Sequence, residues 1–117
     1  MKKVLAVEGQ DWLHNRWRNE LSLHSNGQVK LISALSVDEA AEKFMANHDL
    51  DAIVIDADIG DGAILLVEKF REIFTTGPMI AIAKSEIGKR ALVCAGCNYE
   101  AGTKESVPRK LLGIFGL

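Results

Sequence analysis

Short apolar runs rich in β-branched residues place the tightest limit on the fold of this chain. Four of them cover residues 4–7, 29–32, 52–55 and 79–82, and a weaker fifth covers residues 97–101. Apolar runs of this length with little polar alternation are typical of strands buried on both faces. We therefore expect a sheet that helices cover on both sides.

The segments between these runs carry the spacing of amphipathic helices. Leu13, Trp17 and Leu21 recur at every fourth residue, and apolar residues form further stripes at residues 40–45 and 64–73. This spacing predicts a helix between each strand and the next.

Helix start and stop signals agree with this alternation. Ser36 and Glu39 have the spacing of a capping box, Gly96 ends a helix predicted at residues 87–95, and Ser106 opens a last helix. Strands that alternate with helices imply right-handed crossovers and a parallel sheet. The predicted fold class is α/β, a doubly wound (βα)5 arrangement of the flavodoxin-like type.

Length and charge limit the function. A chain of 117 residues with 48% hydrophobic content is enough for one domain, predicted over residues 1–117. A net charge of -2 argues against binding nucleic acid or a membrane surface, so we expect protein partners. No apolar run reaches the roughly 18 residues of a spanning helix, and no secretory signal is evident, which predicts a cytoplasmic protein.

Polar residues follow each predicted strand, where ligands of parallel sheets bind. Carboxylates beside a lysine at this edge could hold a hard divalent cation or stabilise a phosphoryl group on one carboxylate. The residues concerned are Glu8, Gly9, Gln10 and Asp11 after the first strand, Asp56, Asp58 and Asp61 after the third, Ala83, Lys84 and Ser85 after the fourth, and Thr103 and Lys104 after the fifth.

The order of these features resembles the CheY-like receiver domains of response regulators along the whole chain. The resemblance rests on residues 3–8, 51–56, 61–62, 78–83 and 95–96. It implies a signalling domain of a two-component system or phosphorelay, not an enzyme. It also implies that Asp56 accepts a phosphoryl group from a histidine kinase or phosphotransfer protein with the help of Mg²⁺. Our candidate ligands for this ion are Glu8, Asp56 and Asp58, where Asp58 compensates for the missing second acid after the first strand.

Several positions depart from the receiver pattern. The acidic pair after the first strand is Glu8-Gly9, and Ala83 stands where the family has a hydroxyl that contacts the phosphoryl group. Thr103 falls at the expected lysine position and Lys104 comes one residue later, so a bulge or insertion is needed to retain the lysine. We therefore predict weak or absent Mg²⁺ binding and inefficient phosphorylation.

Three functions remain open at this point. The first is an atypical receiver that acts through protein contacts, and the second is a receiver that is fully competent for Mg²⁺-dependent phosphorylation. The third is a flavodoxin-like small-ligand binder, although Glu8-Gly9-Gln10 is no Gly-rich phosphate loop. In the structural alternative, Asp56 is a helix-cap or turn residue and Glu8 pairs with Lys84 or Lys104.

Other conspicuous residues are predicted to be structural. Cys94 and Cys97 match a C-x-x-C pattern, but they lie at a helix end and a strand start, so we expect buried thiols. Trp17 is predicted to face the sheet. For Trp12 two interpretations remain open: it folds over the first strand as peripheral core, or it is exposed and anchors a protein interface. The face formed by the fourth helix, fifth strand and fifth helix could support a homodimer or contact another signalling protein; it is predicted to present Lys89, Arg90, Glu100, Lys104, Arg109 and Lys110.

Overall fold

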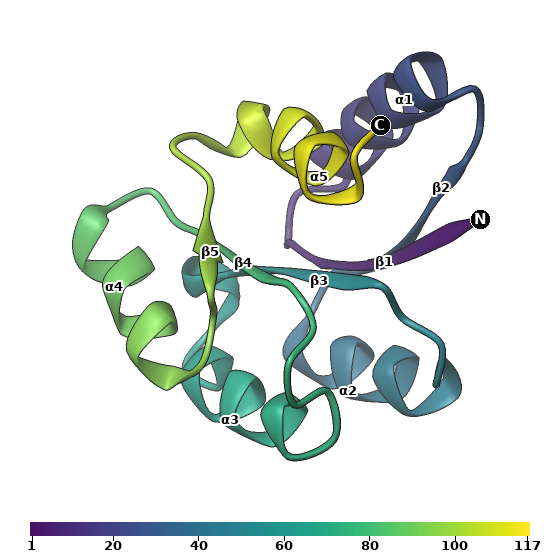
Figure 1. Ribbon diagram of the computed structural model, residues 1–117. Coiled ribbons are helices and arrows are strands. Elements are labelled where there is room, and N and C mark those ends of the chain that lie inside the picture. Colours follow the sequence, from purple (N-terminus) through teal and green to yellow (C-terminus); the bar gives the residue numbers. More distant parts are fainter.

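A computed structural model describes all 117 residues. Five strands form one sheet in the order β2-β1-β3-β4-β5, and every neighbouring pair is parallel (Figure 1). The predicted doubly wound (βα)5 fold is confirmed. The strands are β1 (Lys2–Val7), β2 (Val29–Ala34), β3 (Ala52–Asp56), β4 (Met79–Ile82) and β5 (Tyr99–Glu100).

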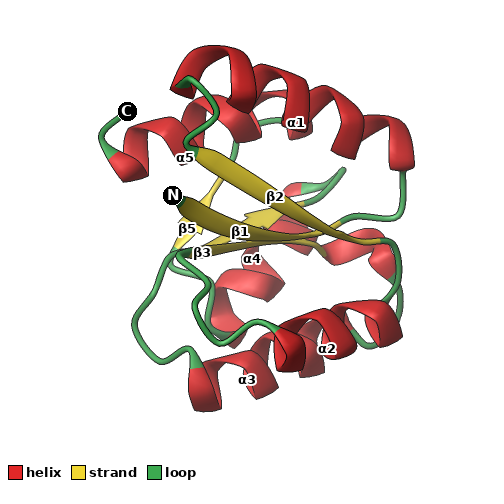
Figure 2. Ribbon diagram, turned by 90° about the vertical axis from the view of Figure 1, so that its right-hand side faces the viewer, coloured by secondary structure: helices red, strands yellow, loops and turns green.

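Helices cover both faces of the sheet. On one face lie α1 (Asp11–Ser25) and α5 (Val107–Phe115), and on the other lie α2, α3 and α4 (Figure 2). The second group comprises α2 (Val37–Ala46), α3 (Ala63–Ile73) and α4 (Glu86–Ala95). Two short 3-10 turns, η1 (Ala57–Ile59) and η2 (Lys104–Ser106), follow β3 and β5. None of the helices combines the length and the apolar content needed to cross a lipid bilayer.

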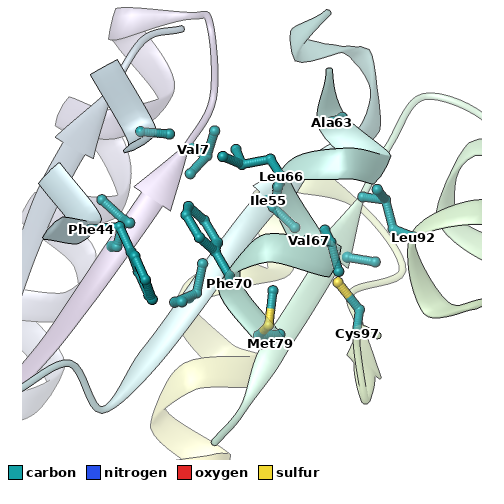
Figure 3. Close-up of a cluster of buried hydrophobic side chains, with 14 of the residues drawn as sticks. Val7, Phe44, Ile55, Ala63, Leu66, Val67, Phe70, Met79, Leu92 and Cys97 are labelled. Atoms are coloured by element: carbon teal, nitrogen blue, oxygen red, sulfur yellow. The ribbon is translucent and has the colours of Figure 1, made fainter. Parts of the chain in front are cut away.

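The strands divide the core into two layers because successive side chains point to opposite faces. Leu5 of β1 packs in the layer under α2 and α3, whereas Val4 packs in the layer under α1 and α5. Figure 3 shows the first layer, where the rings of Phe44 and Phe70 stack with centroids 4.2 Å apart. Trp17 is fully buried in the second layer, as predicted.

The helix ends follow the predicted signals with one difference. The Ser36 hydroxyl accepts a hydrogen bond from the Glu39 backbone N–H (3.1 Å). The Glu39 carboxylate accepts in turn from the N–H of Leu35 (3.2 Å), one residue before the position expected for a capping box. Gly96 ends α4 with a φ of 148°, a conformation that L side chains rarely adopt.

Four predictions outside the site are wrong in part. The fifth strand is only Tyr99–Glu100, because Asn98 turns its side chain back to accept from the Met79 N–H (2.9 Å). Trp12 is 53% exposed and is not peripheral core. Cys97 is buried as predicted, but Cys94 is exposed. Lys89 is buried and Lys104 points into the strand edge, so neither belongs to the predicted charged face.

Candidate functional site

The site begins with two carboxylates at the carboxyl edge of the sheet. Glu8 follows β1 and Asp56 ends β3, and the parallel register pairs Val7 with Ile55 directly before them. The two residues are only 1% and 2% exposed. Buried carboxylates require charged or hydrogen-bonding partners, because their desolvation is costly. The register of two hydrophobic strands therefore places a pair of acids where a cation is needed.

Lys104 supplies that cation. Its Nζ lies 2.8 Å from Oε1 of Glu8 and 3.0 Å from Oδ2 of Asp56. The predicted pairing of Glu8 with Lys104 is thus present. Lys84 instead is exposed and donates its backbone N–H to Oδ2 of Asp58 (2.8 Å). One ammonium between two carboxylates leaves the cluster with a formal charge of -1.

A 3-10 turn brings Lys104 into register, and no strand bulge is needed. Thr103 caps η2: its N–H donates to the Ser106 hydroxyl (3.2 Å), which donates back to the Thr103 carbonyl (2.7 Å). The indole N–H of Trp17 donates to the Lys104 carbonyl (2.8 Å). Because the turn directs Thr103 away and Lys104 inward, the lysine is retained although it comes one residue late.

The two oxygens of Asp56 have different partners. Oδ1 accepts from the Asp58 backbone N–H (3.0 Å) and caps η1, while Oδ2 faces Lys104. The predicted turn-capping role of Asp56 is therefore present together with the lysine contact. One carboxylate serves both, so the structural and functional interpretations of this residue do not exclude each other.

Glu8 is held less completely. Its Oε2 accepts from the Gln10 backbone N–H (2.9 Å). Its Oε1 is within ion-pair distance of Lys104 but accepts no hydrogen bond of good geometry. The Glu8 carbonyl accepts from Nε2 of His14 (2.7 Å), which must carry the proton because a carbonyl only accepts. Helix α1 thus fixes the backbone of Glu8, while Oε1 depends on the Lys104 ammonium alone.

Burial and pairing shift the pKa values in the cluster. Burial raises the pKa of the Asp56 carboxyl, although the Asp58 N–H and Lys104 oppose that rise, and the charge of Glu8 adds to it. Burial disfavours the Lys104 ammonium, but its contacts with Glu8 and Asp56 outweigh burial and raise the pKa of Lys104. The lysine therefore stays charged across the neutral range.

The residues as placed do not fit a complete divalent-cation site. No three acidic, histidine or cysteine side chains form a group that could hold a metal ion. Asp58 directs Oδ2 to the Lys84 N–H, and an ammonium already lies against Glu8 and Asp56. Mg²⁺ needs near-octahedral oxygen ligands, so the predicted set of Glu8, Asp56 and Asp58 stays a prediction.

The end of β4 is packed by small residues. Ala83 has a methyl group at the position where the receiver pattern has a hydroxyl, and this methyl group lies under α4. A Cβ added to Gly88 would come within 3.1 Å of the Ala83 Cβ and 3.3 Å of the Ala57 Cβ. The N-terminal turn of α4 therefore packs directly against the ends of β3 and β4. Glu100 of β5, predicted on the charged face, is exposed.

Sequence reasoning missed two residues that support this site. Trp17 was expected only in the core, yet its indole N–H holds the Lys104 backbone. Lys89 was expected on a charged face, yet it is buried beside the turn before Lys104. Neither role has a sequence signal. The Lys89 contact joins residues 13 positions apart in the chain, and the Trp17 contact joins residues 87 positions apart.

Comparison with solved structures shows which known fold this chain has. No family model matches the chain, and no curated protein matches its sequence. Solved structures do match over nearly the whole chain. A CheY-like response regulator receiver domain protein from Methanospirillum hungatei JF-1 has a TM-score of 0.80 at 18% identity, covering 99% of this chain and 91% of that one.

Two further structures show the same likeness. A two-component response regulator from Clostridium difficile has a TM-score of 0.80 at 19% identity, covering 99% of this chain and 97% of that one. A Burkholderia pseudomallei response regulator, solved with a phosphorylated aspartic acid, calcium ion and citrate, has a TM-score of 0.80 at 16% identity and covers 97% of this chain and 65% of that one. The chain therefore has the CheY-like receiver fold of response regulators.

Proposed function

We propose that this protein is an atypical signalling receiver that acts through protein contacts, with Asp56 as an inefficient phosphoacceptor. The observation that carries the proposal is an incomplete set of metal ligands: no third acidic side chain joins Glu8 and Asp56, because Gly9 follows Glu8 and Asp58 binds the Lys84 N–H. The Lys104 ammonium, 2.8 Å from Glu8 and 3.0 Å from Asp56, also neutralises one of the two carboxylate charges that would attract a divalent cation. Half-buried Ala83, at the end of β4, offers no hydroxyl that would contact a phosphoryl group.

The fold, and its similarity to solved response regulator structures, also support the proposal. The acids and the lysine lie at the carboxyl edge of a doubly wound sheet, where such folds bind their ligands. The partner under this proposal is a histidine kinase, a phosphotransfer protein or another signalling protein, and Trp12, 53% exposed at the start of α1, is an anchor for it. The domain carries a signal and is not itself an enzyme.

The test is a titration with Mg²⁺ in the presence and absence of beryllofluoride, followed by amide NMR shifts around Asp56. We expect no saturable response at millimolar Mg²⁺ in the wild-type protein. The Lys104→Met variant is the matched comparison, because it frees both carboxylates and should gain cation affinity. Saturable binding by wild type, with shifts that spread to β4 and β5, would contradict the proposal.

One observation favours a phosphorylation-competent receiver as the second candidate. Oε1 of Glu8 is buried with only the Lys104 ammonium beside it, at 2.8 Å and without good hydrogen-bond geometry, and a bound divalent cation would satisfy it more fully. Under this alternative, a small-molecule phosphodonor labels wild type in a Mg²⁺-dependent manner and does not label Asp56→Asn. Equal labelling of both proteins would remove Asp56 from consideration as the acceptor.

A further inference from the structure

A buried lysine on α4 holds the segment that carries Lys104. Lys89 is 4% exposed, and its Nζ lies 2.7 Å from Oε1 of Glu86. The same ammonium donates to the backbone carbonyls of Gly102 (3.3 Å) and Ala101 (3.5 Å). Lysines are almost never buried unless they are paired, and this one is bound by a carboxylate and two carbonyls.

The two carbonyls belong to the turn between β5 and η2. Ala101 is itself fixed to the sheet, because its N–H donates to the Ala81 carbonyl of β4 (3.1 Å). Two residues after Gly102, the side chain of Lys104 enters the site. The turn is therefore held by β4 on one side and by Lys89 of α4 on the other, directly before the residue that neutralises Glu8 and Asp56.

Helix α4 also touches the site through Gly88, the residue directly before Lys89. Gly88 packs against Ala83, the residue after β4, and against Ala57, the residue after Asp56. Close-packed contacts of this kind transmit small displacements, since the interior has no free volume to absorb them. A shift of α4 would thus reach the carboxylate pair along two routes, the Gly88 contact and the Lys89 hydrogen bonds.

We propose that Lys89 is a positioning residue, which fixes the turn at residues 101–103 so that the Lys104 ammonium stays between Glu8 and Asp56. The position of α4 is thereby coupled to the charge balance of the site. The signalling consequence rests on the proposed function: a protein that binds α4 would alter the carboxylate pair. The coupling itself is a property of the fold and is testable without any phosphodonor.

The test compares Lys89→Met with Arg90→Met, a matched control that removes one positive charge from the exposed neighbouring position of α4. The readouts are the ¹³C titration of the Asp56 carboxyl and hydrogen exchange at the Ala101 amide. In Lys89→Met we expect the pKa of Asp56 to rise further, because Lys104 leaves the carboxylates. We expect Ala101 to exchange about tenfold faster. Arg90→Met should leave both unchanged.

A double variant separates positioning from general destabilisation. In a Lys104→Met background, Lys89→Met should no longer move the Asp56 titration, because the group that it positions is absent. A shift of equal size in both backgrounds, or an unchanged Asp56 titration in Lys89→Met, would overturn the proposal. If Lys89→Met does not fold, Glu86→Gln is the milder change. It should shift the Asp56 titration in the same direction, and an unchanged titration there would equally overturn the proposal.

Discussion

At the scale of single residues, the site depends on one cation shared by two buried acids. Lys104 has a side chain that is only 12% exposed, and Glu8 and Asp56 are more deeply buried still. Removing one partner of a buried ion pair is costly, because the remaining charge keeps its desolvation penalty. The pH dependence of the fold should therefore report on Lys104 and Asp56, whose pKa values are shifted in the fold.

Replacing Lys104 by methionine should lower the free energy of unfolding by about 3 kcal/mol at pH 7. The pKa of Lys104 is raised in the fold, so its stabilisation is complete below the ordinary value of 10.5 and is lost as the pH rises through the raised value. Urea unfolding of both proteins from pH 7 to pH 12 measures this. The difference between them should shrink at the alkaline end, and a constant difference would show that lost packing, not charge, is responsible.

Asp56→Asn should change the acid side of the stability profile. The pKa of Asp56 is raised above its ordinary value of 3.8, chiefly by burial, so its contribution is present at low pH and is lost as the pH rises through the raised value. Wild type should therefore lose stability relative to the variant as the pH increases from 3.8. The opposite slope in paired denaturant titrations would mean that the ion pair with Lys104 outweighs burial.

At the scale of elements, two glycines on helices illustrate opposite roles. Gly96 ends α4 at φ 148°, and an added Cβ would come within 2.7 Å of Cγ of Arg71, whose Nε donates to the Gly96 carbonyl (2.7 Å). Gly113 lies inside α5 with nothing within 4 Å of an added Cβ. The first glycine is needed by the backbone, and the second only weakens its helix.

We expect Gly96→Ala to destabilise the protein by about 1 to 3 kcal/mol, since it strains the backbone and displaces Arg71. Gly113→Ala is the control and should stabilise by about 0.4 to 1 kcal/mol. Thermal unfolding followed by circular dichroism measures both. Equal effects of the two substitutions would show that the turn after α4 adapts to a side chain without cost.

At the scale of the whole molecule, two thiols close in sequence differ because one lies under the sheet. Cys97 packs in the core layer of α2, α3 and α4, and burial raises its pKa to about 12 (Figure 3). Cys94 is exposed on α4. The protein should therefore contain one protected thiol and one accessible thiol, and no reactive pair.

A thiol reagent at pH 8 should modify Cys94 in the native protein and Cys97 only after unfolding, since the thiolate is the reactive form. Mass spectrometry of the native and urea-unfolded protein counts the labels, and Cys94→Ser is the control that should remain unlabelled while folded. Rapid labelling of Cys97 in the folded variant would show that the layer beneath α4 opens on the experimental timescale.

The sequence alone determined the architecture. Runs such as residues 52–55 are typical of buried strands, helical spacing filled the gaps between them, and chain order then implied the parallel sheet. It also placed Glu8 and Asp56 at one edge, because parallel strands end together. These features are local patterns, and local patterns are readable from residue order.

The tertiary structure decided which lysine meets the acids and which lysine is buried. A one-residue difference between Thr103 and Lys104 depends on how η2 folds against Trp17, and the burial of Lys89 depends on where α4 lies beside the end of β5. Both outcomes arise from contacts between side chains and backbone groups of distant elements. Residue spacing does not predict such contacts, because they form only when the elements pack together.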